Sequence, residues 1–317
     1  FKYSHLEIPM PPLVKTGDSI NIRARVKNTG SYRGSTLTDL IIDGKVDQSK
    51  RIDLKPGEEK NIRFIYIPNR ESVCRIVIGD LKPALLRIQG PADKPHYNDS
   101  LFSALNARLF LDFDEGETAI IRDRSGKNNN AQVKGRLNWV PGIYGQAIQT
   151  NASIGGYIAL PDSITSNDPG QELTLMAWVY PEEEKNFSDI ISKGEWNSLQ
   201  LKGSNQLINF YADGWEGHEA MAPVPENWNR HWHHLAGVSD GTNYKLYVDG
   251  KLVETKKGEK RNPRGETGTA NYSGSPWGIG RNANSPERVF NGYIDEVMIF
   301  QKALNHEQIV NLMLHIY

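Results

Sequence analysis

Hydrophobic and polar positions alternate along residues 230–253, which have the sequence RHWHHLAGVSDGTNYKLYVDGKLV. A period of two fits this stretch better than a helical period, since Trp232 and Val238 fall on the same apolar parity. The dipeptides Asp240-Gly241 and Asp249-Gly250 tolerate the positive φ angles of tight hairpin turns. The stretch is therefore predicted to form a β-meander of three strands.

The same alternation runs through the first part of the chain. Residues 20–27 carry apolar side chains at even positions and polar or charged ones at odd positions, so one face of that strand is apolar. Turn sequences such as Asp43-Gly44 and Pro56-Gly57 recur at a spacing typical of a β-sandwich. We expect about seven short strands between Leu6 and Ile88.

Three runs in this region, GDSINIRARVKNTGS, DGK and LKPGEEKNIRFIY, resemble the CARDB-type immunoglobulin-like modules of bacterial cell-surface and secreted proteins. The resemblance implies an Ig-like β-sandwich over residues 1–89. Residues 90–105, GPADKPHYNDSLFSAL, contain two prolines and a glycine and show neither periodicity. We predict that they form a short linker.

Short strands between turn residues resume at residue 106 and continue to residue 300. Helical spacing returns only near the C-terminus, where Asn305 and Gln308 form an N-cap sequence before an apolar stripe. The sequence therefore predicts a second all-β region, residues 106–317, that ends in one short helix.

Sequence blocks in this second region resemble, in order, the LamG-like jelly roll of the concanavalin A-like lectin/glucanase superfamily. The blocks are LFLDFDEGETAIIRDRSGKNNNAQVKG, PGIYGQAIQTNASIGGYIALPDS, LTLMAWVYP, NRHWHHLAGVSDGTNYKLYVDGKLV, WGIGRNA and GYIDEVMIFQKALNHEQIVNLM. The resemblance implies an antiparallel sandwich of two sheets, usually an accessory or sugar-binding module of a secreted bacterial protein and often with bound Ca²⁺. It also implies that Trp178 and Trp232 are core residues.

Composition argues against several classes of function. Lys and Arg total 37 and Asp and Glu total 38, so the net charge of -1 offers no field for nucleic acid or an anionic membrane. The single cysteine, Cys74, excludes an intramolecular disulfide and a cysteine-built metal site. No run approaches the roughly 18 apolar residues needed to span a bilayer.

The first residue is Phe1 rather than Met. We therefore expect the chain to be a C-terminal fragment of a longer protein. The two resemblances imply that this protein is secreted, periplasmic or attached to the cell surface.

One carboxylate in the strand GYIDEVMIF is the first candidate for a metal ligand. Both parities of this strand are largely apolar, which places Asp295 at the edge of the core. A buried carboxylate needs a cation, an Arg or Lys, or a set of backbone N–H groups. The resemblance favours a structural Ca²⁺. As further ligands we expect Asp114 and Asn130 first, with Asp112 and Asp123 behind them.

An alternative interpretation of these four further residues needs no metal. In it, the two aspartates of LDFDEG lie on a solvated strand face, and the other two residues cap turns.

Tryptophans in loop-like segments are candidates for sugar binding, because an exposed indole can stack on the apolar face of a sugar ring. These are Trp196, Trp215, Trp228 and Trp277. Trp215 is preferred, since acidic residues beside it could bind sugar hydroxyls. The predicted ligand-binding residues are Trp215, Trp196, His218, Asp213 and Glu216. Alternatively, the loop tryptophans cover the ends of the core, since Trp is highly buried on average.

The same superfamily contains retaining glucanases, in which Glu, Asp and Glu alternate along one strand, and no such strand occurs here. On a regular strand Asp295 and Glu296 point to opposite faces, so they cannot form a catalytic pair about 5 Å apart. We predict a non-catalytic accessory region that binds a glycan or polysaccharide. The alternatives are structural or adhesive modules that pack on a catalytic domain of the same polypeptide and, less favoured, a glycoside hydrolase.

Overall fold

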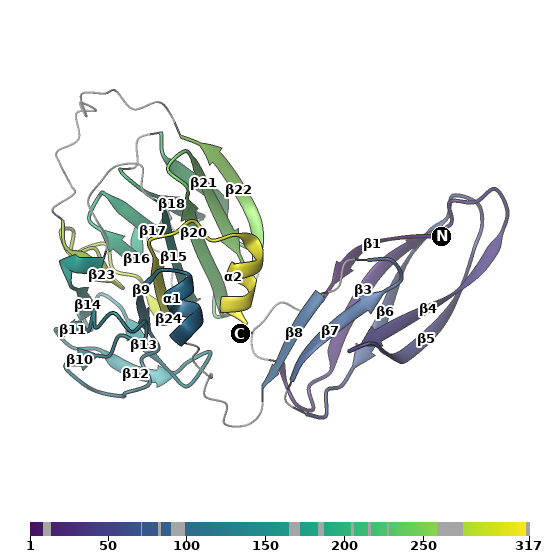
Figure 1. Cartoon of the computed structure of the whole chain (residues 1–317), viewed down its shortest axis with the longest axis horizontal. Coiled ribbons are helices and arrows are strands. Elements are labelled where there is room, and N and C mark those ends of the chain that lie inside the picture. Colours follow the sequence, from purple (N-terminus) through teal and green to yellow (C-terminus); the bar gives the residue numbers. More distant parts are fainter. Residues whose placement is uncertain are drawn as a thin grey trace. The chain divides into compact units, whose positions relative to one another are not determined.

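The computed structural model describes residues 1–8, 14–70, 72–81, 84–89, 99–164, 172–182, 187–203, 206–214, 217–226, 228–258 and 275–314. The chain divides into two compact units, Phe1–Asp93 and Lys94–Tyr317. Both consist mainly of β-strands (Figure 1), so the predicted all-β class is confirmed. No helix in the described ranges is long and apolar enough to cross a membrane.

The first unit contains two sheets around one hydrophobic cluster. Their strand orders are β1-β3-β6 and β2-β8-β7-β4-β5. The strands are β1 (Lys2–Glu7), β2 (Val14–Lys15), β3 (Ile20–Lys27), β4 (Gly34–Ile42), β5 (Lys45–Leu54), β6 (Glu59–Tyr66), β7 (Ser72–Ile78) and β8 (Ala84–Gln89). Ile22, Phe64 and Ile76 are fully buried between the sheets. The alternation predicted for residues 20–27 is thus the inner and outer face of β3.

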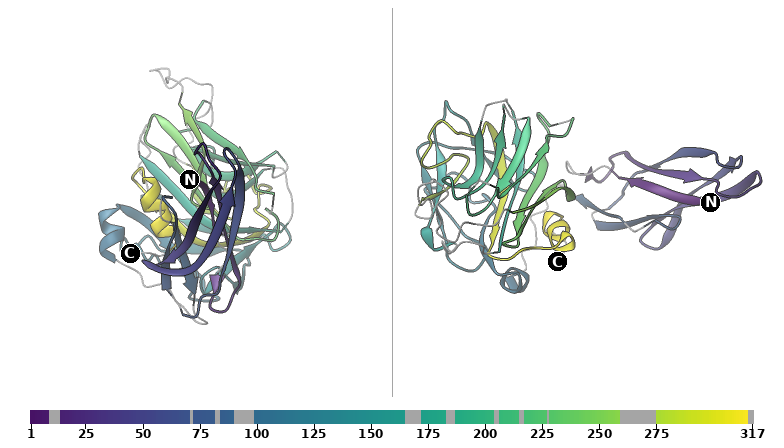
Figure 2. Two further views of the ribbon diagram at one scale, coloured as in Figure 1. Left: turned by 90° about the vertical axis from the view of Figure 1, so that its right-hand side faces the viewer. Right: turned by 90° about the horizontal axis from the view of Figure 1, so that it is seen from above.

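The second unit is a sandwich of two large sheets (Figure 2). We name them sheet I, with the order β10-β11-β14-β23-β16-β17-β18-β19, and sheet II, with the order β12-β13-β24-β15-β20-β21-β22 and β9 paired to β24.

The strands of sheet I are β10 (Ile120–Ile121), β11 (Ala131–Lys134), β14 (Tyr157–Leu160), β16 (Ser188–Lys193), β17 (Asn197–Lys202), β18 (Leu207–Tyr211), β19 (Glu219–Pro223) and β23 (Trp277–Ile279). Those of sheet II are β9 (Ala107–Leu111), β12 (Asn138–Pro141), β13 (Gln146–Thr150), β15 (Leu173–Pro181), β20 (His233–Ser239), β21 (Asn243–Val248), β22 (Lys251–Lys257) and β24 (Gly292–Phe300). The helices are α1 (Asp99–Ala104), the 3-10 turn η1 (Asp162–Ile164) and α2 (His306–Met313).

Sheet II is covered on both faces, which explains its nearly continuous apolar strands. Leu175 of β15 packs toward sheet I in the main core cluster. Its neighbour Met176 packs on the opposite face, in a second cluster with Phe102 of α1 and Leu312 of α2. The central position expected for the strand GYIDEVMIF is confirmed, because β24 lies between β13 and β15.

Helix α1 lies in the second half of the predicted linker. Phe102 of this helix is fully buried, and its ring centroid is 5.1 Å from that of Phe110. Residues 99–105 therefore belong to the second unit, while residues 90–98 lie outside the described residues. Six helical residues are too few to show a periodic pattern in the sequence.

The meander and the C-terminal helix form as predicted. Strands β20, β21 and β22 pair in succession, with Gly237 opposite Leu246. At the second turn Asp249 and Gly250 have φ values of 50° and 73°. At the start of α2, the Asn305 side chain accepts a hydrogen bond from the Gln308 N–H, completing the predicted capping box.

Candidate functional site

A row of polar side chains crosses the face of sheet I that is turned away from the core. Strands β17 and β18 place Ser198, Gln200 and Asn209 on this face, while Leu199 and Phe210 between them point into the main core cluster. The three polar residues are 0%, 4% and 0% exposed. Such burial is uncommon for polar side chains outside a hydrophobic core, unless they are hydrogen-bonded.

Hydrogen bonds between neighbouring strands hold the row together. Nε2 of Gln200 donates to Oδ1 of Asn209 over 2.8 Å, and Nδ2 of Asn209 donates to Oε2 of Glu219 over 2.9 Å. Nζ of Lys202 forms an ion pair of 3.2 Å with the same Glu219 oxygen. One network thus joins β17, β18 and β19.

Two side-chain atoms on this face have unused hydrogen-bonding capacity. Oε1 of Gln200 and Oγ of Ser192 have no hydrogen-bond partner among the described residues. Both residues are buried, and an unsatisfied buried polar group costs about 1–3 kcal/mol. These two buried atoms therefore retain unused hydrogen-bonding capacity.

Asp189, near the start of β16, extends the row toward the end of the sheet. Its Oδ1 accepts a hydrogen bond of 2.9 Å from the Ser198 hydroxyl. Complete burial raises the pKa of Asp189 to about 7, although the Ser198 hydroxyl and the Arg288 guanidinium oppose the rise. Arg288 is itself ion-paired with Glu195, in the turn between β16 and β17. Asp189 therefore changes charge near neutral pH.

Two of the predicted ligand-binding residues, Trp196 and Asp213, lie together at one end of sheet I. The turn after β16 and the loop after β18 meet there because Ser198 pairs with Tyr211. The Trp196 carbonyl accepts a hydrogen bond of 2.7 Å from the Gly214 N–H. Both Trp196 and Asp213 are partly exposed. They form a rim at the end of the polar row.

The other predicted sugar-binding residues are placed differently or lie outside the described residues. His218 is 8% exposed, and its ring stacks on Tyr244 with a centroid distance of 5.3 Å. Tyr244 belongs to the main core cluster, so the imidazole packs at the edge of the core. Trp215 and Glu216 lie outside the described residues.

The loop position expected for Trp277 was wrong, whereas Trp228 lies between strands as expected but is buried, in line with the alternative that the loop tryptophans cover the core. Trp277 lies in β23, which pairs with β14 and β16, and it is fully buried. Trp228 is 3% exposed and belongs to the main core cluster. The sequence around Trp277, GSPWGIG, resembles a loop because its glycines and proline conceal a strand of three residues. Trp178 and Trp232 are buried as predicted.

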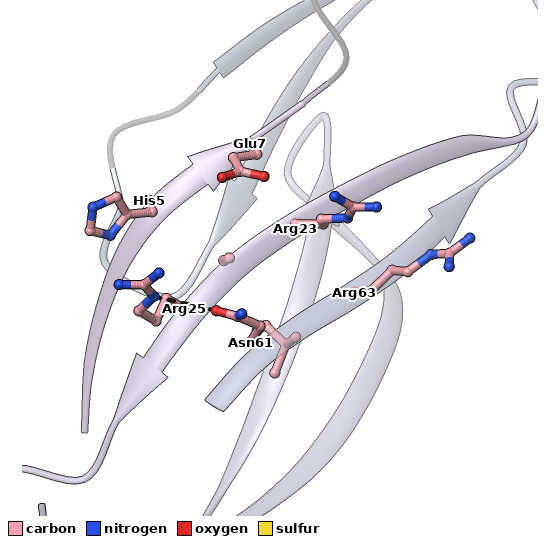
Figure 3. Close-up of a pocket in the computed structure, with 8 residues that line it drawn as sticks. His5, Glu7, Arg23, Arg25, Asn61 and Arg63 are labelled. Atoms are coloured by element: carbon pink, nitrogen blue, oxygen red, sulfur yellow. Dashed lines mark hydrogen bonds between the residues drawn. The ribbon is translucent and has the colours of Figure 1, made fainter. Parts of the chain in front are cut away.

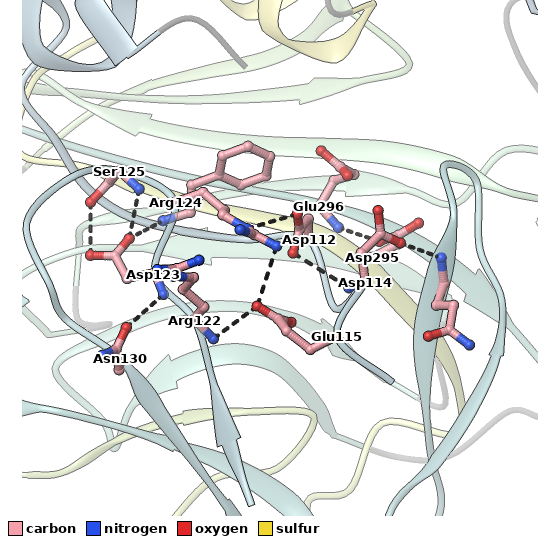
Figure 4. A network of polar contacts seen from close by, with 12 residues as sticks. Asp112, Asp114, Glu115, Arg122, Asp123, Arg124, Ser125, Asn130, Asp295 and Glu296 are labelled. Carbon is pink, nitrogen blue, oxygen red and sulfur yellow. Dashed lines mark hydrogen bonds and ion pairs between the residues drawn. The ribbon is translucent and has the colours of Figure 1, made fainter. Parts of the chain in front are cut away.

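Asp295 is fully buried and is satisfied by backbone N–H groups, of which that of Glu296 is seen in Figure 4. Its Oδ2 accepts hydrogen bonds of 3.0 Å from Ile143 and 3.2 Å from Tyr144, and its Oδ1 accepts one of 2.8 Å from Glu296. Burial raises the pKa of Asp295 well above its usual value, and the charge of Asp114 raises it further. A buried carboxylate can be satisfied by a cation, by an Arg or Lys, or by backbone N–H groups, and the structure shows the backbone N–H groups.

Asp114 and Asp295 hold the same turn from two sides. Oδ1 of Asp114 accepts a hydrogen bond of 2.8 Å from the Gln146 N–H. A Cβ atom at Gly145 would lie 1.9 Å from Asp114 Oδ1, and one at Gly142 would lie 2.3 Å from Asp295 Oδ2. The glycines of the PGIYGQ segment are therefore required for this close approach.

Glu296 joins the same acidic cluster because β24 is irregular at this point. The register with β15 shifts after Asp295, and Glu296 has a φ of 51°. The strict alternation assumed for a regular strand does not apply to this pair. Glu296 is buried, and burial followed by the charges of Asp295, Asp112 and Asp114 raises its pKa well above the usual value. Asp112 forms a 3.0 Å ion pair with Arg124.

Asp123 and Asn130 organise the neighbouring SGKNNN loop. The Asp123 carboxylate accepts four hydrogen bonds, from the backbone N–H groups of residues 110, 125 and 129 and from the Ser125 hydroxyl, at 2.8–3.0 Å. Oδ1 of Asn130 accepts a hydrogen bond of 2.9 Å from the Asp123 N–H. These two residues therefore cap turns, while Asp112, Asp114 and Asp295 lie together (Figure 4).

The fit of this region to Ca²⁺ is mixed. Carboxylate oxygens are the ligands that Ca²⁺ prefers. Within the described ranges, however, no three Asp, Glu, His or Cys side chains are arranged so that they could hold a metal ion. Side chains alone do not make the site, and the predicted structural Ca²⁺ stays a prediction.

Comparison with protein families agrees with the architecture of the second unit. The sequence model of the concanavalin A-like lectin/glucanases superfamily matches residues 151–310. The chain belongs to this superfamily. The match confirms the resemblance seen in the sequence. It does not extend to the first unit, whose CARDB-type identity stays a prediction. No curated protein matches the chain.

Several solved structures are similar to this chain at low sequence identity. Domain 4 of AbnA, a GH43 extracellular arabinanase from Geobacillus stearothermophilus in complex with arabinotriose, is 21% identical, with a TM-score of 0.47 over 65% of this chain and 98% of that domain. A receptor binding domain is 18% identical, with a TM-score of 0.50 over 68% of this chain and 53% of that one. The botulinum neurotoxin serotype C1 binding domain is 17% identical, with a TM-score of 0.49 over 65% and 51%. The chain spans about half the length of the last two.

Proposed function

We propose that the second unit is a carbohydrate-binding module whose sugar site is the polar row of sheet I, with the rim loops at its end. The observation that carries this proposal is the hydrogen-bonding capacity left at Gln200 and Ser192 on a buried polar face. Membership of a superfamily of lectins and glucanases supports it.

The chemistry of the row suits sugar hydroxyls, each of which donates one hydrogen bond and accepts others. The Gln200 carbonyl oxygen can accept a hydrogen bond from a sugar hydroxyl, and the Ser192 hydroxyl can either donate or accept one. Because Gln200 is already fixed by Asn209 over 2.8 Å, it loses little conformational freedom when a ligand binds.

Access to the row comes from its more exposed members. The side chains of Lys202 and Glu219 are 30% and 15% exposed, and Trp196 at the rim is partly exposed. A sugar ring that stacks on the Trp196 indole brings its hydroxyls toward the polar side chains, since the apolar face and the polar edge of a sugar are perpendicular.

The wider context is part of the proposal. The chain acts as a non-catalytic accessory region of a secreted, periplasmic or cell-surface protein, and the first unit is a CARDB-type Ig-like spacer. A catalytic domain of the same polypeptide is the expected partner. A structural Ca²⁺ near Asp114 and Asp295 is also proposed, on the chemistry of the carboxylates gathered there.

A glycan array tests the function. The full chain is applied to immobilised plant and host glycans beside two variants, Trp196→Ala and Trp215→Ala. The wild type is expected to bind at least one neutral glycan, and each variant is expected to bind it more weakly. Failure of the wild type to bind any glycan would leave the structural or adhesive alternative.

A further inference from the structure

The outward face of the sheet β1-β3-β6 in the first unit is strongly basic. Strand β3 turns its even residues toward the core and its odd residues toward this face. The residues of β1 and β6 that pair with the odd residues of β3 lie on the same face. The charged side chains of these strands on this face are Lys2, Arg23, Arg25, Lys27 and Arg63, against Glu7 and Glu59. Five positive and two negative charges leave an excess of three, whereas the whole chain has a net charge of -1.

Part of this face forms a hollow of about 370 Å³ (Figure 3). The residues that line it are His5, Glu7, Arg23, Arg25, Asn61 and Arg63, together with the buried Ala24 and Ile62. In Figure 3, Arg25 lies on the side of His5, and the Arg23 and Arg63 side chains extend together on the other side. Guanidinium groups therefore flank the hollow at both ends.

Arg23 and Arg63 are direct cross-strand partners in the β3–β6 register. Like charges directly opposite each other on a sheet are destabilising. Glu7, the partner of Arg23 on β1, offsets this repulsion only in part. Some electrostatic repulsion between the two arginines therefore remains in the free protein. An anion bound between their guanidinium groups would remove it.

The three arginines differ in how many of their guanidinium N–H groups already have partners within the chain. Arg25 is ion-paired with Glu59 over 3.0 Å, and Arg63 donates to the side-chain oxygen of Asn21. The Arg23 guanidinium makes no hydrogen bond or ion pair with another residue in the described ranges. Its five donors are thus available to a ligand, and a planar guanidinium binds a carboxylate through two parallel hydrogen bonds.

We infer that this basic face binds the carboxylate groups of an acidic polysaccharide, with Arg23 and Arg63 as its central contacts. Residues two apart on one strand are separated by about 6.6 Å, so Arg23, Arg25 and Lys27 present positive charges in a row along which a polymer of uronic acids can lie. The anion site follows from the first unit alone. The choice of a glycan as its carrier rests on the function proposed for the second unit.

Nucleic acid and lipid fit this face less well. Single-stranded nucleic acids need aromatic platforms for their bases, and β3 and β6 present no aromatic side chain on this face, since Phe64 and Tyr66 lie on the core side. A face for anionic lipid would pair its basic residues with an apolar, inserting set. Six of the eight residues around the hollow are instead charged or polar, and the other two, Ala24 and Ile62, are buried on the core side and offer no inserting set.

The test uses the full chain and polygalacturonate as the probe, with affinity measured by titration calorimetry at low and high salt. Wild type is expected to bind, and to bind more weakly as salt rises. The double variant Arg23→Gln/Arg63→Gln is expected to bind at least ten-fold more weakly at low salt. Arg51→Gln is the matched control, because Arg51 lies on β5 of the other sheet and its side chain is 75% exposed. It should bind as wild type does.

Several results would overturn the inference. These are no binding by the wild type, equal binding by the double variant, an equal loss in the Arg51 control, or tighter binding to duplex DNA or phosphatidylserine vesicles than to polygalacturonate. The unfolding midpoint checks the folding of the double variant, which should equal or exceed the wild type at low salt because a repulsive pair is gone. Variants of the polar row, such as Gln200→Met, should still bind polygalacturonate. The experiment therefore distinguishes a failure of the basic-face proposal from a failure of the polar-row proposal.

Discussion

The side-chain amide of Gln200 donates a hydrogen bond of 2.8 Å to Oδ1 of Asn209 across strands β17 and β18. Because Asn209 in turn donates to Glu219, a change at one position is transmitted to the others. The same contact orients the Gln200 amide so that its Oε1 is left available. The network thus fixes the orientation of the Gln200 amide and leaves one of its hydrogen-bonding atoms without a partner in the described part of the chain.

The charge state of Asp189 predicts a pH-dependent stability. The folded protein keeps the proton of Asp189 up to its pKa of about 7, whereas the unfolded chain loses it near 3.8. The contribution of this group is therefore fully present below pH 3.8 and is lost as the pH rises through about 7. Over that window the loss is on the order of 4 kcal/mol, from a shift of about three pKa units.

Asp189→Asn isolates this effect, since an amide does not ionise and still accepts a hydrogen bond from Ser198. The free energy of unfolding of the variant, minus that of the wild type, should rise between pH 5 and pH 8 in denaturant titrations. Other buried acids, such as Asp295 and Glu296, cancel in this difference. A difference that stays constant with pH would show that Asp189 is ionised throughout.

Two glycines with similar backbone angles should respond differently to alanine. Gly145 has a φ of 53° and its added Cβ would meet Asp114, whereas Gly126 has a φ of 79° and open space around it. Gly126→Ala should cost about 1 kcal/mol, the price of a positive φ for a residue with a Cβ. Gly145→Ala should cost roughly 2 kcal/mol more because it also displaces the Asp114 carboxylate.

Chemical denaturation of the two glycine variants provides the measurement. Equal losses of unfolding free energy would show that the turn near Asp114 and Asp295 relaxes freely. That result would remove the close approach of turn and carboxylate as a stabilising feature.

Removal of Ca²⁺ tests the proposed structural ion. A ligand bound only by the native state raises stability, by about 2.7 kcal/mol when its free concentration is one hundred times its dissociation constant. Treatment with EGTA should therefore lower the unfolding midpoint of the wild type, and excess Ca²⁺ should restore it. Asp295→Asn should reduce the response. The same midpoint in EGTA and in excess Ca²⁺ would mean that backbone N–H groups alone satisfy Asp295.

Local alternation was sufficient to predict the sheets. A period of two together with turn chemistry predicted the meander of residues 230–253 and the inner and outer residues of β3. The central place of β24 followed from apolar residues on both of its parities. The Asn305 capping box was predictable for the same reason, because its partners are three residues apart. Helix α1 was not, since six residues carry no periodicity.

The polar row could not be assembled from sequence because its members come from four strands. Only the sequence NSLQLK of β17 indicated a polar face locally, because Ser198 and Gln200 fall on one parity and the leucines on the other. Which strands lie beside it depends on sheet order. Likewise, two of the three backbone partners of Asp295, the N–H groups of Ile143 and Tyr144, lie about 150 residues away in sequence. The irregularity of β24 at Glu296 is not signalled by the local sequence.

The central claim is that the polar row of sheet I binds a sugar. The most direct measurement is the affinity, by titration calorimetry, of wild type, Gln200→Met and Gln132→Met for the neutral glycan that gives the strongest array signal. Methionine keeps the volume of glutamine and removes its hydrogen bonds, and Gln132 is an exposed residue of β11 in the same sheet, outside the row. Gln200→Met should bind at least ten-fold more weakly than the wild type, while Gln132→Met should bind equally well. Unchanged affinity in a folded Gln200→Met variant would contradict the assignment of the site.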